Sequence, residues 1–123
     1  CVVLRSITNT YIDVHCPTGS RFFPQRYGIE EFRIKCYNDE GDCFRQHVDV
    51  GDLNSSRRFL SFLFYLNDDF DGGSTVFRTP DKKVVQPEQG KCLIFPPTWQ
   101  YPHEGKPVKC GTKYIMSTYL HYV

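Results

Sequence analysis

The segment Arg58–Asn67 reads RFLSFLFYLN and is the most apolar stretch of this chain of 123 residues. A short apolar run rich in Phe and Leu, bounded by polar residues, is typical of a strand that is buried on both faces. Its apolar part, Phe59–Leu66, is far shorter than the roughly 20 residues that a helix needs to cross a bilayer, so we expect no membrane span. We predict that Arg58–Asn67 is the central strand of the core.

Shorter strand patterns flank this segment on both sides. Between Glu30 and Tyr37, apolar residues alternate with charged and polar ones, which is the period of a half-buried strand. Further strands are expected, in chain order, at Phe44–Val50, Ser74–Phe77, Lys83–Gln86, Lys91–Phe95 and Lys113–Val123, with turns rich in Gly, Asp and Pro between them. Many short strands joined by tight turns predict a jelly-roll.

The composition also favours strands over helices. The chain has no alanine, 15% of its residues are aromatic, and Val, Ile and Thr are frequent. A chain of this length forms one domain, so we expect a single, mainly β domain over residues 1–123, with its core at about 30–123 and little helix. Prolines and glycines interrupt residues 1–29, where we expect loops and short elements; they are Pro17, Gly19, Pro24 and Gly28.

Charge and cysteine content restrict the expected partners and compartment. The formal net charge is +1 with the signs interspersed, which gives no support for nucleic-acid binding. The six cysteines form no dense framework, and several lie in apolar strand-like segments, so we expect them to be reduced. No basic start followed by an apolar core is present, so no signal peptide is expected and a cytoplasmic location is favoured.

Two metal-binding side chains stand two residues apart at the end of the expected Phe44–Val50 strand. Residues two apart in a strand project from the same face, so His47 and Asp49 can reach one point in space. A third ligand must come from elsewhere, and the remaining histidines are His15, His103 and His121. We favour His103 because it stands in Pro96–Gly105, a rigid Pro-rich turn that can hold a ligand at the entrance of a strand.

The proposed ligand set has the chemistry of an open metal site. Two imidazoles and one carboxylate on one face of an octahedral ion leave three positions free, which suits a non-haem Fe(II) that binds a co-substrate and dioxygen. Lys113 adds to this hypothesis, because it precedes the apolar residues Tyr114–Met116, where an ammonium is costly to bury without an anion such as a carboxylate. The alternative is that Lys113 reaches solvent from a strand edge.

The chain resembles a known family through an ordered set of motifs. In chain order these are Cys36-Tyr37, His47-Val48-Asp49, Phe64–Asn67, Gly72–Phe77, Pro87, Gly90–Pro96, His103–Gly105, Val108 and Gly111–Tyr114. The set spans roughly residues 30 to 122 and is similar to the Fe(II)- and 2-oxoglutarate-dependent dioxygenases, and within them to the prolyl 4-hydroxylase-like branch. The resemblance implies a distorted double-stranded β-helix, which is a cupin-like jelly-roll whose open end holds the iron. The N-terminal helices that brace the larger sheet in that family are expected to be short or missing.

The resemblance also assigns roles to individual residues. It implies that His47, Asp49 and His103 hold Fe(II), with 2-oxoglutarate and dioxygen as co-substrates and ascorbate as a candidate accessory. For 2-oxoglutarate, it implies that the Lys113 ammonium pairs with the distal carboxylate and that the Tyr65 hydroxyl donates to the same carboxylate. It also implies that Tyr37 and, as a weaker candidate, Ser117 line the pocket.

The activity implied by the resemblance is hydroxylation of a C–H bond with release of succinate and carbon dioxide. The expected substrate is a prolyl or other amino-acid side chain in a peptide or protein, or a small amino-acid-like molecule, with proline favoured over lysine. One alternative is a non-catalytic jelly-roll metal-binding module. A nucleic-acid demethylase is disfavoured because the chain has no basic patch. The sequence leaves the substrate and the oligomeric state open.

Overall fold

The structure is a computed structural model that describes residues 1–16, 18 and 20–123. The elements in chain order are α1 (Val2–His15), a 3-10 turn η1 (Ser20–Phe22), β1 (Tyr27–Ile29), β2 (Arg33–Asn38), β3 (Phe44–His47), β4 (Arg58–Tyr65), β5 (Asp71–Gly72), β6 (Thr75–Phe77), β7 (Lys83–Val85), β8 (Cys92–Phe95), β9 (His103–Gly105), β10 (Val108–Cys110) and β11 (Thr112–Tyr122). Within the described part of the chain, none of the helices is long and apolar enough to cross a membrane.

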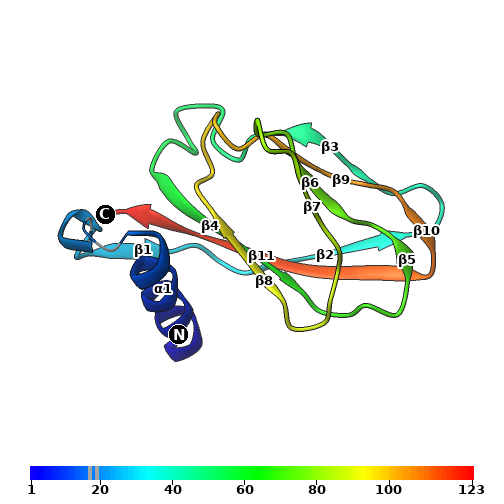
Figure 1. Ribbon diagram of the computed structural model, residues 1–123, viewed down its shortest axis with the longest axis horizontal. Coiled ribbons are helices and arrows are strands. Elements are labelled where there is room, and N and C mark those ends of the chain that lie inside the picture. Colours follow the sequence, from blue (N-terminus) through cyan, green and yellow to red (C-terminus); the bar gives the residue numbers. More distant parts are fainter. Residues whose placement is uncertain (17, 19) are drawn as a thin grey trace.

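Two antiparallel sheets form the body of the molecule (Figure 1). The larger sheet has the order β1-β11-β4-β8, and β2 also pairs with β11. The smaller sheet has the order β3-β9-β6-β7 and lies over one face of the larger sheet, while β10 and β5 form a short pair at one end. Phe77 of β6 meets Phe95 of β8 between the sheets, with ring centroids 4.9 Å apart. The predicted mainly β jelly-roll is confirmed.

Strand β4 is the buried strand that the segment Arg58–Asn67 predicted. Its alternate side chains face opposite sides of the larger sheet. On the outer side Leu60 and Phe62 are fully buried, and they pack with Leu120 of β11 and with Leu4 of α1. On the inner side, toward the smaller sheet, Tyr65 is also buried, at 1% exposure. The central strand therefore joins a helix-covered core to the interior of the jelly-roll.

The expectation of loops and short elements at the N-terminus is wrong for residues 2–15, which form the 14-residue helix α1. Leu4, Ile7, Thr8 and Tyr11 follow the spacing of one helix face and turn toward the larger sheet. The helix is rich in β-branched residues, which have low helix propensity, so burial against the sheet supplies the stability that propensity does not. Pro17 and Gly19, two of the residues that suggested interruption, lie outside the described residues.

The prediction for Pro96–Gly105 is correct in part. A turn precedes His103, which stands at the entrance of a strand as expected, but residues 103–105 themselves form strand β9, which was not predicted. Three residues are too few to show a period of two, and the neighbouring prolines favour a turn in any reading of sequence alone. Strand β9 lies between β3 and β6, and its register places His103 opposite both His47 and Phe77. Strands β1, β5 and β10 are only two or three residues long and were not predicted either.

Candidate metal centre

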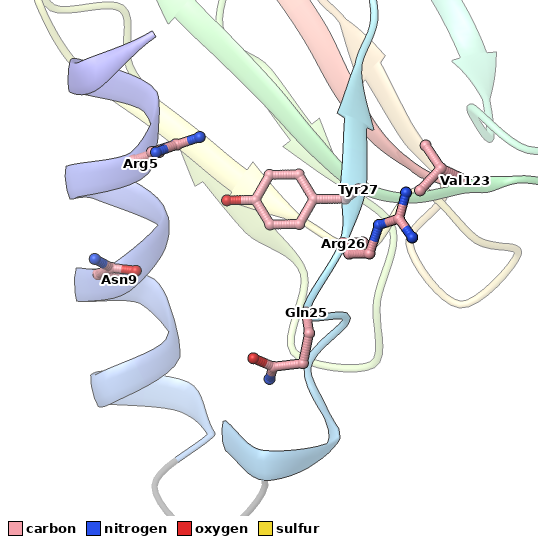
Figure 2. Close-up of a pocket in the computed structure, with 6 residues that line it drawn as sticks. All are labelled: Arg5, Asn9, Gln25, Arg26, Tyr27 and Val123. Atoms are coloured by element: carbon pink, nitrogen blue, oxygen red, sulfur yellow. The ribbon is translucent and has the colours of Figure 1, made fainter.

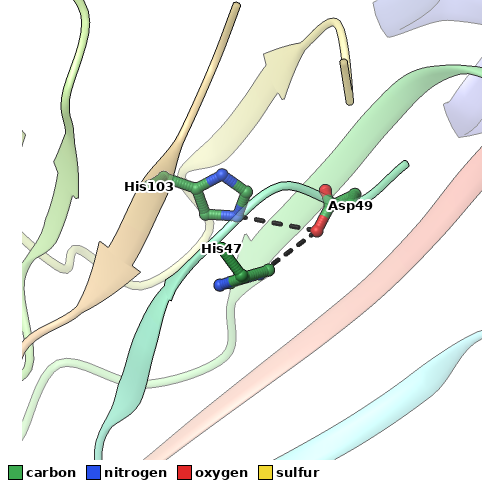
Figure 3. A group of neighbouring side chains, drawn as sticks. All are labelled: His47, Asp49 and His103. Atoms are coloured by element: carbon green, nitrogen blue, oxygen red, sulfur yellow. Dashed lines mark ion pairs between the residues drawn. The ribbon is translucent and has the colours of Figure 1, made fainter. Parts of the chain in front are cut away.

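The pairing of β3 with β9 brings together the three side chains that the sequence selected. His47 and His103 are directly opposite each other in this pairing. Asp49 follows β3 by two residues, in the bend that leads away from the strand. Figure 3 shows the carboxylate of Asp49 next to both imidazole rings, with all three side chains converging on one point.

The ligand atoms of the three residues are close enough to share one metal ion. The Oδ1 atom of Asp49 lies 3.3 Å from Nε2 of His47 and 3.6 Å from Nε2 of His103. Each Nδ1 atom contacts a backbone carbonyl two residues earlier, at 2.8 Å for His47 and 3.0 Å for His103. An N–H at Nδ1 that donates to a carbonyl leaves the lone pair on Nε2, so both lone pairs are directed toward the Asp49 carboxylate.

Asp49 is itself held by residues of β4. The hydroxyl of Ser61 donates to Oδ2 of Asp49 at 3.1 Å, on the carboxylate oxygen that faces away from the histidines. Arg58 donates to the backbone carbonyl of Asp49 at 3.3 Å, and its guanidinium also makes two hydrogen bonds to Glu30, at 2.7 and 2.9 Å. Oδ1 faces the two imidazoles and is the carboxylate oxygen available to a metal.

The electrostatics favour the unprotonated ligands that a divalent cation requires. Burial acts to raise the pKa of Asp49, but the imidazoles of His47 and His103, when they are protonated, and the Ser61 hydroxyl outweigh it, so that the pKa is lowered. Burial lowers the pKa of His103, although the contact with the Tyr101 carbonyl and the charge of Asp49 oppose it. An ionised carboxylate beside a neutral imidazole is the protonation state in which both bind metal.

Aromatic rings enclose one side of the group and leave the other side open. Phe77 and Phe95 pack on the His103 ring, with centroids 5.6 and 4.9 Å away. The side chain of His103 is 6% exposed, whereas that of His47 is 25% exposed, so the group is reached from the His47 side. Two nitrogens, one oxygen and an open approach fit a six-coordinate Fe(II) with free positions better than a closed tetrahedral zinc site.

Lys113 of β11 is buried at 4% exposure, so the alternative that it reaches solvent is wrong. Its ammonium donates to the carbonyl of Gly73 at 2.6 Å and lies 5.4 and 5.5 Å from the ring centroids of Tyr37 and Tyr65. Within the described residues, no carboxylate forms an ion pair with it. Burial lowers the pKa of Lys113 to about 8. A buried cation without a counter-charge is a ready site for an anionic ligand.

Gly73 makes this arrangement possible. Its φ of 66° lies in the left-handed region, and a Cβ atom there would stand 3.1 Å from the Cδ atom of Lys113 and 3.0 Å from the ring of Phe70. Only glycine brings its carbonyl to the ammonium without displacing these side chains.

The other predicted pocket residues lie at different distances from Lys113. Tyr37 of β2 is directly opposite Lys113 in the β2–β11 pairing, and its side chain is half-buried. The Tyr65 hydroxyl is 2.6 Å from the Oγ1 atom of Thr75, so its hydroxyl already has one partner. Ser117 is buried on the same face of β11, but it lies four residues from Lys113, about 13 Å along the strand.

Three residues of the centre were missed by sequence reasoning. Ser61 and Arg58 support Asp49, and Gly73 contacts Lys113. Only Ser61 gave a signal, because it is a polar residue in an otherwise apolar strand and such a residue needs a partner. The two other histidines lie away from the metal group: His15 packs on Tyr11 with ring centroids 4.7 Å apart, and His121 lies against Gly28.

A separate hollow lies between α1 and β1, outside the jelly-roll interior. Figure 2 shows Tyr27 of β1 pointing across it toward the helix, from which Arg5 and Asn9 project. Its volume is about 650 Å³, and Gln25, Arg26 and Val123 complete its lining. None of these residues belongs to the His47, Asp49, His103 group, so we place no part of the metal chemistry there.

We predict that Ser61→Ala weakens binding of a divalent metal by about tenfold or more, since an unsupported carboxylate loses its fixed orientation. Cobalt(II) is a suitable probe, because its visible absorption reports both affinity and coordination. Thr8→Val is the matched control, because it removes another buried hydroxyl, on the far side of the larger sheet. Equal Co(II) affinity in wild type and Ser61→Ala would show that the Ser61 contact does not position Asp49.

We also predict that Lys113→Met stabilises the metal-free protein at pH 7. In the folded state the pKa of Lys113 is about 8, below the ordinary value of 10.5, so the ammonium destabilises the fold below pH 8 and this cost disappears as pH rises toward 10.5. The gain in unfolding free energy should be about 2–3 kcal/mol at pH 7 and should shrink above pH 8. Urea unfolding at several pH values measures it, with the exposed Lys109→Met as control. A gain that does not change with pH would contradict the assignment.

The comparisons with known proteins agree with this geometry. Residues 32–121 match the family model of the 2OG-Fe(II) oxygenase superfamily. The chain is 27% identical over 118 residues to the multifunctional procollagen lysine hydroxylase and glycosyltransferase of Rattus norvegicus, covering 93% of this chain and 15% of that protein. It is 29% identical over 108 residues to a putative prolyl 4-hydroxylase of Acanthamoeba polyphaga mimivirus, covering 81% of this chain and 42% of that protein.

A solved structure shows the same fold. The viral collagen prolyl hydroxylase of Paramecium Bursaria Chlorella virus-1, in its 2OG complex, superposes with a TM-score of 0.76 at 22% identity, covering 98% of this chain and 71% of that one. The chain spans less than half the length of the two curated relatives named above. The family match over residues 32–121 includes the metal group, Lys113 and both sheets apart from β1, and the chain belongs to the 2OG-Fe(II) oxygenase superfamily.

Proposed function

We propose that this chain is the catalytic domain of an Fe(II)- and 2-oxoglutarate-dependent dioxygenase that hydroxylates a prolyl or other amino-acid side chain of a peptide or protein. In this proposal residues 1–123 act as a single domain. For each substrate C–H bond that is hydroxylated, one dioxygen and one 2-oxoglutarate are consumed, and succinate and carbon dioxide are released. Dioxygen is the oxidant, and ascorbate is a candidate accessory reductant.

One observation carries the proposal. The interior between the two sheets contains an open group of two imidazoles and a carboxylate. It also contains a buried ammonium, that of Lys113, with which no carboxylate of the described residues forms an ion pair. A structural metal site has no use for the second feature, since burying an uncompensated charge costs stability. A dicarboxylate co-substrate that chelates a metal at one end and leaves a carboxylate at the other accounts for both features.

The roles of the side chains follow from their surroundings. His47, Asp49 and His103 would hold Fe(II), which with 2-oxoglutarate supplies the oxidation of the C–H bond. Asp49 contributes a negative charge that neutralises part of the charge of the metal, and Ser61 and Arg58 keep it in place. The phenylalanines that pack on His103 exclude water from that side.

The pocket for the distal carboxylate would lie around Lys113. Its ammonium would donate to that carboxylate, and the fixed ring of Tyr65 would bring its hydroxyl to the same group. Tyr37 would line the pocket from β2, across the strand pairing. Ser117 is a candidate for the far wall of the interior, beyond direct reach of Lys113.

A peptide or protein substrate is supported by the relatives. The Rattus norvegicus protein is described as a procollagen lysine hydroxylase, and the viral structure as a collagen prolyl hydroxylase. Proline is placed ahead of lysine because prolyl hydroxylases occur among both the curated and the structural relatives. The non-catalytic metal-binding module is the competing proposal, and activity assays separate the two.

The test is an aerobic assay with Fe(II), 2-oxoglutarate, ascorbate and a proline-rich collagen-like peptide. We expect succinate together with a peptide mass gain of one oxygen, and both should fall at least about a hundredfold in Asp49→Ala, which lacks the only anionic ligand. Asp81→Ala, at an exposed turn between β6 and β7, is the control and should keep full activity. Full activity in Asp49→Ala with normal metal content would contradict the proposal. Metal binding without succinate formation would favour the binding module.

A further inference from the structure

We propose that Lys35 selects substrates that carry a carboxylate close to the residue being hydroxylated, so that the preferred substrates are acidic peptides. This inference rests on the proposed function and adds a substrate class to it. Arg33 supports the same selection from the outer edge of the site.

Lys35 points into the jelly-roll interior. In the pairing of β2 with β11, Lys35 is opposite Ile115, and its neighbours Arg33 and Tyr37 are opposite Ser117 and Lys113. Residues directly opposite each other in an antiparallel pair project from the same face of the sheet. Since Ile115 and Lys113 are buried on the inner face, Lys35 faces that interior too. The residues between, such as Ile34, which is 67% exposed, face outward.

The ammonium of Lys35 lies at the entrance to the metal group. It stands 4.4 Å from the centroid of the Phe44 ring, and that ring meets the His47 ring edge-on with centroids 4.0 Å apart. The side chain of His47 is the more exposed of the two imidazoles, so Lys35 borders the open side of the group. A substrate that reaches the metal from this side must pass close to Lys35.

Within the described residues, no carboxylate forms an ion pair with Lys35. Burial lowers the pKa of Lys35, and the charge of Asp49 acts in the opposite direction. Arg33 is close enough to add repulsion. Arg33 itself lies 4.0 Å from Glu30, whose carboxylate is already bound to Arg58. The entrance is therefore cationic.

The loaded site does not neutralise this charge. Fe(II) carries two positive charges, whereas Asp49 and the dianion of 2-oxoglutarate together carry three negative charges. The loaded group therefore has an excess of one negative charge. In the proposed function that excess is balanced by Lys113. Lys35 is thus left with an uncompensated half-buried charge in the complex that awaits substrate, and such a charge favours an anionic partner.

The spacing limits where the substrate carboxylate can be. The Lys35 ammonium lies 4.4 Å from the centroid of the Phe44 ring, which in turn lies 4.0 Å from the centroid of the His47 ring. Each residue of an extended peptide advances the chain by about 3.5 Å. The acidic residue is therefore expected within one or two positions of the hydroxylated residue.

The experiment uses one proline-containing peptide in three versions, with Glu, Gln or Lys at the positions adjacent to the proline. Hydroxylation is followed by mass spectrometry. Binding to the Co(II)-loaded protein with 2-oxoglutarate is followed by fluorescence anisotropy, which needs no turnover. The proteins are wild type, Lys35→Met, Lys35→Glu and the control Lys83→Met, which removes a lysine from β7, at the opposite edge of the smaller sheet.

We expect wild type and Lys83→Met to favour the Glu peptide over the Gln peptide by about tenfold, with the Lys peptide weakest, and added salt to reduce the preference. Lys35→Met should lose the preference, and Lys35→Glu should favour the Lys peptide. The inference is overturned if wild type shows no preference, if no peptide binds, or if Lys35→Met keeps the preference. If the wild type neither forms succinate nor binds 2-oxoglutarate, the proposed function is contradicted instead.

Discussion

The antiparallel pairing of β4 with β11 is the constraint on which both the core and the candidate centre depend. On its outer face, Phe62 and Leu120 are fully buried under α1. On its inner face the same two strands carry Ser61, which holds Asp49, and Lys113, which faces the pocket between the sheets. A shift of one residue in this register would exchange the two faces, and the polar groups would enter the apolar core. Packing under the helix and chemistry between the sheets are thus fixed by one set of backbone hydrogen bonds.

The interior between the sheets holds two lysines in different surroundings. Lys113 lies deep, against the Gly73 carbonyl and two tyrosine rings, whereas Lys35 lies at the entrance, over the Phe44 ring. Asp49 is held by hydroxyl and backbone contacts, and within the described residues it forms no ion pair with either ammonium. Such unpaired charges reduce the stability of the empty protein and are typical of binding sites, where a ligand completes the network. Their separation matches two anionic ligands, one that is bound deep in the pocket and one that approaches from outside.

Sequence reasoning identified the strongest periodic strands and the residues that carry chemistry, because both leave local signals. The apolar run of β4, the alternation of β2 and the His-x-Asp pair are all visible within a few residues. In β2, however, the alternation predicted the strand but not its buried face, because Ile34 is exposed and Lys35 faces the interior. The helix α1 was missed because its β-branched residues and the following Pro17 and Gly19 favour other structures, and burial of the face that carries Leu4 and Thr8 stabilises it instead. Strand β9 was missed because three residues carry no period. The supporting contacts of Arg58 and Gly73 join residues that are separated in the chain, and no local sequence pattern predicts them.

The central claim is that metal and 2-oxoglutarate bind together in this interior, with Lys113 holding the far carboxylate. The most direct measurement is an anaerobic titration of the Fe(II)-loaded protein with 2-oxoglutarate, followed by the weak visible charge-transfer absorption of the chelate. The account predicts a saturable band in the wild type and a requirement for at least about tenfold more 2-oxoglutarate in Lys113→Ala, since a charge-assisted contact is lost. The absence of a band in folded protein that has bound Fe(II), or an unchanged titration in Lys113→Ala, would contradict it.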